Sequence, residues 1–285
     1  MFRKLKAILI VIVLAAALSR AIAGSFNGAW GIQLYSLRDE LATNVPGTLD
    51  EVKRWGVKNV ELAGTYGMTV EQFKAELDRQ GLIPVSAHYP YDEYRTNLDA
   101  IIRDAQALGL KYAGCAWIPP YGHGPLDERK CREAAAVFNR AGKALAQHGV
   151  IFFYHPHGHE FQPYHDGTIF DLLMAETNPK YVHFEMDVFW IVHAGQDPVT
   201  LLKKYHKRWE LMHLKGMRDS TPTGLLTGST DVTNDVALDT GKIDYAPVLR
   251  EAKKIGIKWY FIEDESPSSE QQIPESIRYL KKVRW

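Results

Sequence analysis

Short apolar segments alternate with longer amphipathic ones along most of this chain. The short segments are nearly continuous apolar runs, as expected of strands that are buried on both faces. We predict eight strands, at Gly31–Tyr35, Val60–Leu62, Ile83–His88, Tyr112–Trp117, Val150–Tyr154, Val182–Met186, Leu211–Leu214 and Trp259–Ile262. The segments between them predict helices at Gly47–Trp55, Thr69–Gln80, Asn97–Leu108, Asp127–His148, Ile169–Ala175, Pro198–Tyr205, Tyr245–Ile255 and Gln272–Lys282.

Connections of helical length favour parallel pairing of the strands, because parallel neighbours need a crossover. Eight strand–helix units predict a single (β/α)8 TIM barrel over residues 24–285. The competing fold is an open doubly wound sheet, which normally carries a Gly-rich phosphate-binding turn after its first strand. No such turn follows Ile32–Tyr35. One connection, residues 215–242, is unusually long and rich in Gly, Thr, Ser and Asp, and we interpret it as a functional loop that acts as a lid.

The first 23 residues have the pattern of a secretory signal peptide. A basic start precedes twelve apolar residues, Ala7 to Leu18, which span about 18 Å as a helix and are short for a ~30 Å hydrocarbon core. Ala21-Ile22-Ala23 then has the small-residue form of a cleavage site. We predict a cleaved signal and export to the periplasm or the medium, against an uncleaved membrane anchor as the alternative. Nothing later in the sequence is apolar for long enough to span a membrane.

The charge balance argues against a nucleic-acid partner. The 285 residues contain 34 Lys and Arg against 34 Asp and Glu, so the chain lacks the broad positive field that binds phosphate backbones. Two cysteines exclude a disulfide-rich scaffold and a Cys-rich zinc module. We expect Cys115 and Cys131 to be buried free thiols.

Polar residues gather at the predicted strand ends, where the active sites of barrels form. They include Glu61, His88, His155, His157, His159, Glu160, Asp187, His213, Lys215, Glu263, Asp264 and Glu265. Carboxylates that converge inside a ring of apolar strands repel and desolvate one another, and a bound cation removes that cost. Mixed carboxylate and imidazole ligands suit Mn²⁺, Co²⁺, Zn²⁺ or Mg²⁺, so we predict a divalent-metal site. A structural role is the competing interpretation for a single histidine such as His88 or His193.

Several segments together resemble the sugar phosphate isomerase/epimerase superfamily with its xylose-isomerase-like barrel. They are GIQLYS from residue 31, YHPHGHEF from 154, FEMD from 184, HAG from 193, HLK from 213, GKID from 241 and IED from 262. The resemblance covers the whole predicted mature chain. It implies a divalent metal held by Glu160, Asp187, His213 and Glu263. Two departures stand out: Trp190 occupies a position where many members have histidine, and the choice between His157 and Glu160 as the strand-five ligand stays open.

Such a site suits abstraction of a proton next to a carbonyl. The predicted function is therefore a sugar isomerase or epimerase that acts on a keto-sugar through a metal-stabilised enediolate. Glu160 and Glu263 are the predicted catalytic acid and base. The residues assigned to the substrate are Glu61, His88, His155, His157, Trp190, Lys215 and Arg218.

Two other functions compete with this prediction. A lyase or hydratase would expel the β-substituent of a 3-keto-glycoside from the same enediolate, and export favours neutral glycosides over phosphorylated sugars. A non-catalytic sugar-binding barrel is the second alternative, which would not need paired carboxylates around an ion. The expected partner is a small sugar, with no nucleic acid and no membrane after signal cleavage, and a homodimer is left open.

Overall fold

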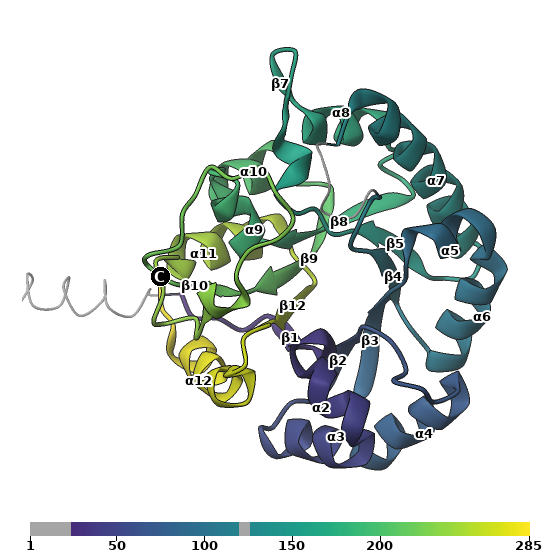
Figure 1. The fold of residues 1–285 in the computed structure, drawn as a ribbon, viewed down its shortest axis with the longest axis vertical. Coiled ribbons are helices and arrows are strands. Elements are labelled where there is room, and N and C mark those ends of the chain that lie inside the picture. Colours follow the sequence, from purple (N-terminus) through teal and green to yellow (C-terminus); the bar gives the residue numbers. More distant parts are fainter. Residues whose placement is uncertain (1–23, 120–125) are drawn as a thin grey trace, which may run out of the picture.

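The chain folds into a closed barrel of eight parallel strands surrounded by helices (Figure 1). The computed structural model describes residues 24–119 and 126–285, so the predicted signal peptide lies outside the described residues. The barrel strands are β1 Ala29–Gln33, β2 Asn59–Leu62, β3 Ile83–His88, β4 Tyr112–Cys115, β5 Ile151–Tyr154, β8 Val182–Asp187, β9 Trp209–Leu214 and β12 Trp259–Ile262. β12 pairs with β1 and closes the ring, which confirms the predicted fold.

Amphipathic helices connect the strands and bury one face against the barrel. The eight predicted helices are present as α3 Val45–Arg54, α4 Val70–Gln80, α6 Leu98–Leu108, α7 Glu128–Ala146, α8 Ile169–Glu176, α10 Pro198–Lys204, α11 Tyr245–Ile255 and α12 Ser269–Lys282. Local sequence sets their ends, as in α4. The Thr69 hydroxyl accepts the N–H of Gln72 at its start, and Gly81 ends it with a φ of 72°, a value that favours glycine.

Several short elements were not predicted. They are the 3-10 helices η1 Leu34–Leu37, η2 His159–Phe161 and η3 Val232–Asn234, the helices α2 Arg38–Thr43, α5 Tyr91–Thr96 and α9 Val188–His193, and the strands β6 Pro163–Tyr164, β7 Gly167–Thr168, β10 Gly216–Met217 and β11 Asp235–Val236. Two predicted strands also end earlier than expected: Leu34 and Tyr35 belong to η1 and not to the first strand, and β4 ends at Cys115 and not at Trp117. Elements of two to six residues are too short to show a hydrophobic period.

The long connection after β9 is an ordered loop. β10 and β11 pair in antiparallel fashion and close its base. Its tip, residues 225–230, hydrogen-bonds to neighbouring segments: the N–H of Leu225 donates to the carbonyl of His193 at 3.1 Å, and the N–H of Gly158 donates to the carbonyl of Thr227 at 3.1 Å. The loop therefore lies across the end of the barrel, as a lid would.

A small apolar layer fills the barrel below the polar strand ends. It consists of Val85, Tyr112, Phe153, Leu211 and Phe261, apart from the main core between strands and helices. Leu211 stands two residues before His213 on β9, and side chains two apart face the same side of a strand. The polar strand ends therefore rest on an apolar floor.

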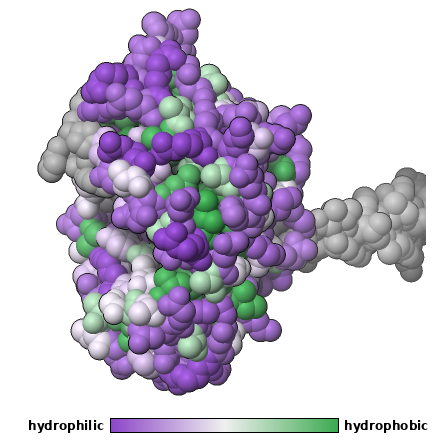
Figure 2. Space-filling model, turned by 90° about the vertical axis from the view of Figure 1, so that its right-hand side faces the viewer, coloured by the Kyte–Doolittle hydropathy of each residue, from purple (hydrophilic) through white to green (hydrophobic). Residues whose placement is uncertain are grey.

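The outer surface is mainly hydrophilic, with hydrophobic residues scattered in small groups on the side that Figure 2 shows. Within residues 24–119 and 126–285, no helix has both the length and the apolar character needed to cross a membrane.

Candidate active site

His213 lies at the centre of the polar strand ends, between two pairs of carboxylates. Its Nδ1 is 3.2 Å from Glu263 Oε2 and 3.7 Å from Asp187 Oδ2. On the other side of the ring, Nε2 is 2.6 Å from Glu61 Oε1 and 3.2 Å from Glu185 Oε2. All five side chains are buried, so each ring nitrogen faces acidic oxygens with little access to water.

His155 and Asp187 present unpaired polar atoms to each other. His155 Nε2 is 3.5 Å from Asp187 Oδ2, and neither atom has a hydrogen bond of good geometry within the described residues. The second carboxylate oxygen of Asp187 is occupied, since Oδ1 accepts the N–H of Trp190 at 3.1 Å and caps α9. Buried polar atoms without partners are costly, and a cation between them would remove the cost.

These observations define a set of four side chains that fits a divalent cation. The members come from the ends of four strands: His155 after β5, Asp187 on β8, His213 on β9 and Glu263 after β12. Ligand atoms of Asp187, His213 and Glu263 lie within 4.8 Å of one another. Two imidazoles and two carboxylates are a donor set that zinc and other divalent transition metals accept. The structure thus brings together three of the four predicted ligands.

The structure does not place Glu160, the fourth predicted ligand, with the other three. The chain leaves the strand direction after Tyr154 and turns into η2, which carries Glu160 beneath the turn. There its carboxylate accepts the hydroxyl of Tyr154 and, at 3.0 Å, the N–H of His157, and it lies 3.2 Å from His159 Nε2. Glu160 therefore stabilises the 155–161 turn, and His155 is the strand-five residue whose imidazole lies beside Asp187, with Nε2 at 3.5 Å from Asp187 Oδ2.

Glu185 is a site residue that the sequence analysis did not single out. It stands on β8 two residues before Asp187, so both side chains face the barrel interior. Its Oε2 lies 3.0 Å from His88 Nε2, and ligand atoms of His88, His155, Glu185 and His213 form a second group within 4.8 Å. Without a cation nearby, burial and the charge of Glu61 raise the pKa of Glu185 well above its ordinary value.

Lys215 forms the cationic side of the site. Its ammonium contacts Glu265 and lies 3.4 Å from Glu263 Oε2 and 3.5 Å from Asp235 Oδ2. Burial alone would lower the pKa of Lys215, but the surrounding carboxylates raise it well above the ordinary value, so the side chain stays charged. Asp235 comes from β11 at the far end of the long loop, and burial raises its pKa to about 7.

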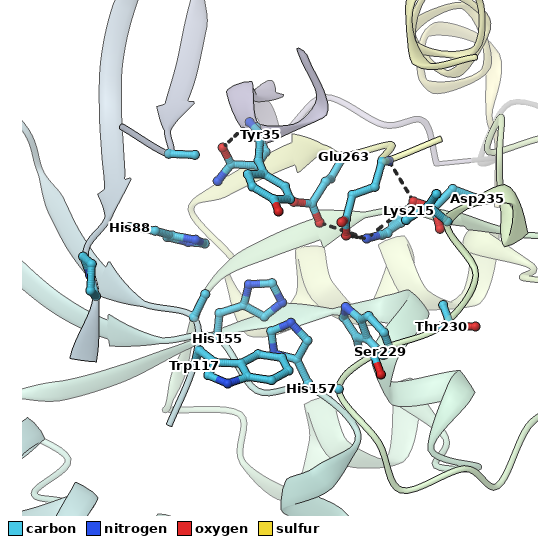
Figure 3. Close-up of a pocket in the computed structure, with 18 of the residues that line it drawn as sticks. Tyr35, His88, Trp117, His155, His157, Lys215, Ser229, Thr230, Asp235 and Glu263 are labelled. Atoms are coloured by element: carbon cyan, nitrogen blue, oxygen red, sulfur yellow. Dashed lines mark hydrogen bonds and ion pairs between the residues drawn. The ribbon is translucent and has the colours of Figure 1, made fainter. Parts of the chain in front are cut away.

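A cavity of about 550 Å³ opens above these groups (Figure 3). Five residues predicted to bind substrate line it, namely His88, His155, His157, Trp190 and Lys215. One wall is aromatic: the His157 ring lies 4.7 Å from the ring of Trp117 and 5.0 Å from that of Trp190. Gly228, Ser229 and Thr230 from the tip of the long loop line the cavity beside this aromatic wall. Flat apolar rings and convergent polar groups suit a sugar ring.

Two residues predicted to bind substrate lie elsewhere. Arg218 is exposed, and its guanidinium donates to the carbonyl of Thr233 at 2.6 and 3.0 Å, which holds the base of the long loop. Glu61 is fully buried beneath the cavity and bonds to His213. Neither side chain lines the cavity.

Comparisons with known proteins identify the family and support the fold. Residues 49–283 match the xylose isomerase-like TIM barrel family. An inosose dehydratase of Clostridium botulinum (strain Alaska E43 / Type E3) is 26% identical over 267 residues, covering 83% of this chain and 86% of that protein. The structure of a sugar phosphate isomerase/epimerase from Parabacteroides distasonis ATCC 8503 is 25% identical, with a TM-score of 0.72 over 90% of this chain and 95% of that one.

The IOLI protein, whose structure holds a zinc atom, shares the fold. Its TM-score is 0.68 over 89% of this chain and 95% of that one, at 14% identity.

Proposed function

Because the chain belongs to the xylose isomerase-like TIM barrel family, we propose that it is a metal-dependent lyase that removes water or another β-substituent from a cyclic keto-polyol or keto-sugar. The similarity to an inosose dehydratase over 83% of the chain supports elimination over the predicted isomerisation. His155, Asp187, His213 and Glu263 would hold the cation. When bound, the cation would supply Lewis-acid polarisation of the substrate carbonyl.

The observation that carries this proposal is the placement of His88 and Lys215 on opposite sides of one cavity (Figure 3). The ring of His88 stacks on that of His213 at 5.7 Å. Lys215 approaches from the other side, where it shares Glu263 Oε2 with His213. Elimination needs a proton acceptor at one carbon and a donor at the oxygen that leaves its neighbour, and these two groups meet that need.

The proposed step balances in atoms and electrons. The imidazole of His88 accepts the proton from the carbon next to the carbonyl, and the electrons of that C–H bond form the new carbon–carbon double bond. The C–O bond at the adjacent carbon breaks, and the ammonium of Lys215 gives a proton to the departing oxygen, which leaves as water or an alcohol. The His88 imidazolium then loses its proton to solvent, and the Lys215 amine regains one. The aromatic wall of Trp117, His157 and Trp190 would hold the ring of the substrate.

Isomerisation or epimerisation is the second candidate function. It begins with the same proton abstraction but returns a proton to carbon and keeps the C–O bond. The 25% identity to a sugar phosphate isomerase/epimerase favours it. The charge of the cavity argues against a phosphorylated substrate, however, because Lys215 is the one Lys or Arg among the described lining residues and three carboxylates neutralise it.

Product mass separates the two candidates. Protein loaded separately with Mn²⁺, Co²⁺, Zn²⁺ or Mg²⁺ is incubated in D₂O with inosose and with a 3-keto-glucoside, and a chelator-treated sample is the control. Elimination gives a product lighter by one water, or by the aglycone alcohol, only in the metal-loaded samples. A product of unchanged formula that carries deuterium on carbon would overturn elimination and support the second candidate.

We also propose that residues 1–23 direct export and that the substrate is a neutral sugar outside the cytoplasm. Support comes from the signal-like sequence and from the neutralised lysine in the cavity. Amino-terminal sequencing of the protein from the periplasm and the medium tests export. A chain that begins at residue 24 is expected, and an intact leader on cytoplasmic protein would contradict the proposal.

A further inference from the structure

Glu61 is a buried carboxylate that lies beneath the cavity. It stands on β2 with an exposed fraction of 0%, and it is absent from the residues that line the cavity. A buried anion must be compensated by hydrogen bonds or opposite charge. The partners of Glu61 therefore indicate its role.

Four side chains surround the Glu61 carboxylate, and one of them is His88, whose Nε2 lies 3.4 Å from Oε1. Gln33 Nε2 donates to Oε1 at 2.7 Å, and the Ser86 hydroxyl donates to Oε2 at 2.5 Å. His213 Nε2 lies 2.6 Å from Oε1. Gln33 and Ser86 come from β1 and β3, the two sheet neighbours of β2, whereas His213 comes from β9, which is separated from β2 by β1 and β12. The bond to His213 thus crosses the barrel interior, while the bonds from Gln33 and Ser86 hold the carboxylate in place.

This arrangement decides which nitrogen of His213 carries a proton. An ionised carboxylate only accepts hydrogen bonds, so the nitrogen at 2.6 Å must be the donor. In the neutral ring, Nδ1 then keeps a lone pair and points to the side of Asp187 and Glu263. That is the side on which the unpaired atoms of His155 and Asp187 meet.

We propose that Glu61 is a positioning residue that fixes His213 as an Nδ1 ligand of the cation. It acts through His213 and does not contact the substrate. A carboxylate behind a ligating histidine sets the tautomer and the ring orientation and raises the basicity of the ligand. Gln33 and Ser86 keep the carboxylate from turning toward another partner.

The first test reads the His213 ring directly. Long-range ¹H–¹⁵N spectra of protein with ¹⁵N-labelled histidine distinguish a protonated, a bare and a metal-bound ring nitrogen, and a His213→Gln variant assigns the signal. In the Zn²⁺-loaded protein we expect a proton on Nε2 and zinc on Nδ1. Zinc on Nε2, or a proton on Nδ1, would overturn the proposal. This measurement uses the unmodified protein and does not depend on the folding of a Glu61 variant.

The second test measures Zn²⁺ affinity by competition with a chromophoric chelator. Glu61→Met removes the acceptor, and we expect Zn²⁺ to bind about 10–100-fold more weakly, the range typical of residues behind metal ligands. Glu61→Gln keeps an oxygen acceptor without the charge and should recover part of the loss. Glu71→Met, the same change at an exposed glutamate on α4, is the control, and its Zn²⁺ affinity should stay at the wild-type value.

Wild-type Zn²⁺ affinity in a folded Glu61→Met protein, with an unchanged His213 spectrum, would refute the positioning role. Circular dichroism and thermal unfolding of the metal-free variants establish that they are folded. Neither test uses a substrate, so failure of the elimination assay leaves this inference intact, and failure here leaves elimination to be decided by product mass.

Discussion

Gly228 packs so closely on Trp117 that a Cβ at this position would lie 2.3 Å from the indole Cη2. The same Cβ would lie 2.8 Å from His159 Nδ1. No side chain larger than hydrogen fits there unless the loop tip moves away from the aromatic wall. The loop tip can therefore contact the aromatic wall only if residue 228 is glycine.

Gly228→Ala should detach the loop tip from the barrel. Weakening the backbone bonds of Leu225 and Gly158 would cost about 1.4 kcal/mol in total, which corresponds to roughly tenfold faster amide exchange at the tip. Hydrogen–deuterium exchange with mass spectrometry measures this, and KM should rise because the tip lines the cavity. Thr223→Ala, an exposed change in the same loop, should leave exchange unaltered. Unchanged protection in Gly228→Ala would contradict the packing argument.

A divalent cation should stabilise the folded protein through the facing atoms of His155 and Asp187. At about 100 times its Kd the cation adds about 2.7 kcal/mol to the free energy of unfolding, which raises Tm by roughly 5–10 °C. Asp187→Ala should abolish this increase, whereas Asp219→Ala, an exposed acidic control, should keep it. Differential scanning calorimetry with and without Zn²⁺ or Mn²⁺ provides the comparison. An equal Tm increase in both variants would rule out Asp187 as a ligand.

Glu160 and Glu263 are both buried glutamates, but their substitution by glutamine should affect different properties of the protein. Glu263→Gln is expected to weaken ion binding by at least about 10–100-fold and to abolish turnover. Glu160→Gln should keep the ion but lose about 1–3 kcal/mol of unfolding free energy, because the turn loses a charged acceptor. Metal content by mass spectrometry and urea unfolding give both quantities. If Glu160→Gln lost the metal and Glu263→Gln kept it, Glu160 and not Glu263 would be the ligand.

Lys215→Met should leave three carboxylates without their counter-ion. Removing one partner of a buried ion pair costs about 3–5 kcal/mol, so the variant should be markedly less stable at pH 7. The deficit should shrink as pH falls, because the unpaired carboxylates then bind protons in the folded state. Urea unfolding from pH 5 to 8 measures the trend, and Lys254→Met, an exposed control, should change stability by no more than about 1 kcal/mol. A deficit that is independent of pH would contradict the charge argument.

Cys115 and Cys131 should not react with iodoacetamide at pH 8 while the protein is folded. The structure confirms that both are free and buried, and burial raises the pKa of each thiol to about 12. Burial favours the neutral thiol in the folded state. Its contribution to the free energy of unfolding is therefore fully present below the unfolded thiol pKa of about 8.5 and declines as pH rises toward 12. Mass spectrometry should show no adduct on the native protein and two after denaturation. Native labelling at pH 8 would contradict the burial of that thiol.

The barrel could be predicted from sequence because its elements repeat a simple physical pattern. Strands buried on both faces are apolar runs, and the helices that cover them carry one apolar stripe. The six residues of α9 escaped prediction because a tertiary feature defines them: the Asp187 carboxylate caps the first turn. A helix this short has no period to detect.

Site residues could be predicted where they lie on a barrel strand or directly follow it. Asp187 and His213 lie on β8 and β9, and Glu263 directly follows β12, so strand-end reasoning placed them together. The assignment of Glu160, which came from the family resemblance, did not hold at strand five, because β5 ends at Tyr154 and the turn carries Glu160 away. Glu185 escaped notice because it lies one pleat below the strand end and not at it.

The place of β12 between β9 and β1 has a consequence for how the protein would acquire an ion. Glu263 follows β12, so a chain in which β12 has not yet paired with β9 would offer His155, Asp187 and His213 without Glu263. Full affinity for the ion would therefore require β12 in its place. If the polypeptide crosses a membrane unfolded, the compartment where it folds, and not the one where it is synthesised, determines which metal it carries.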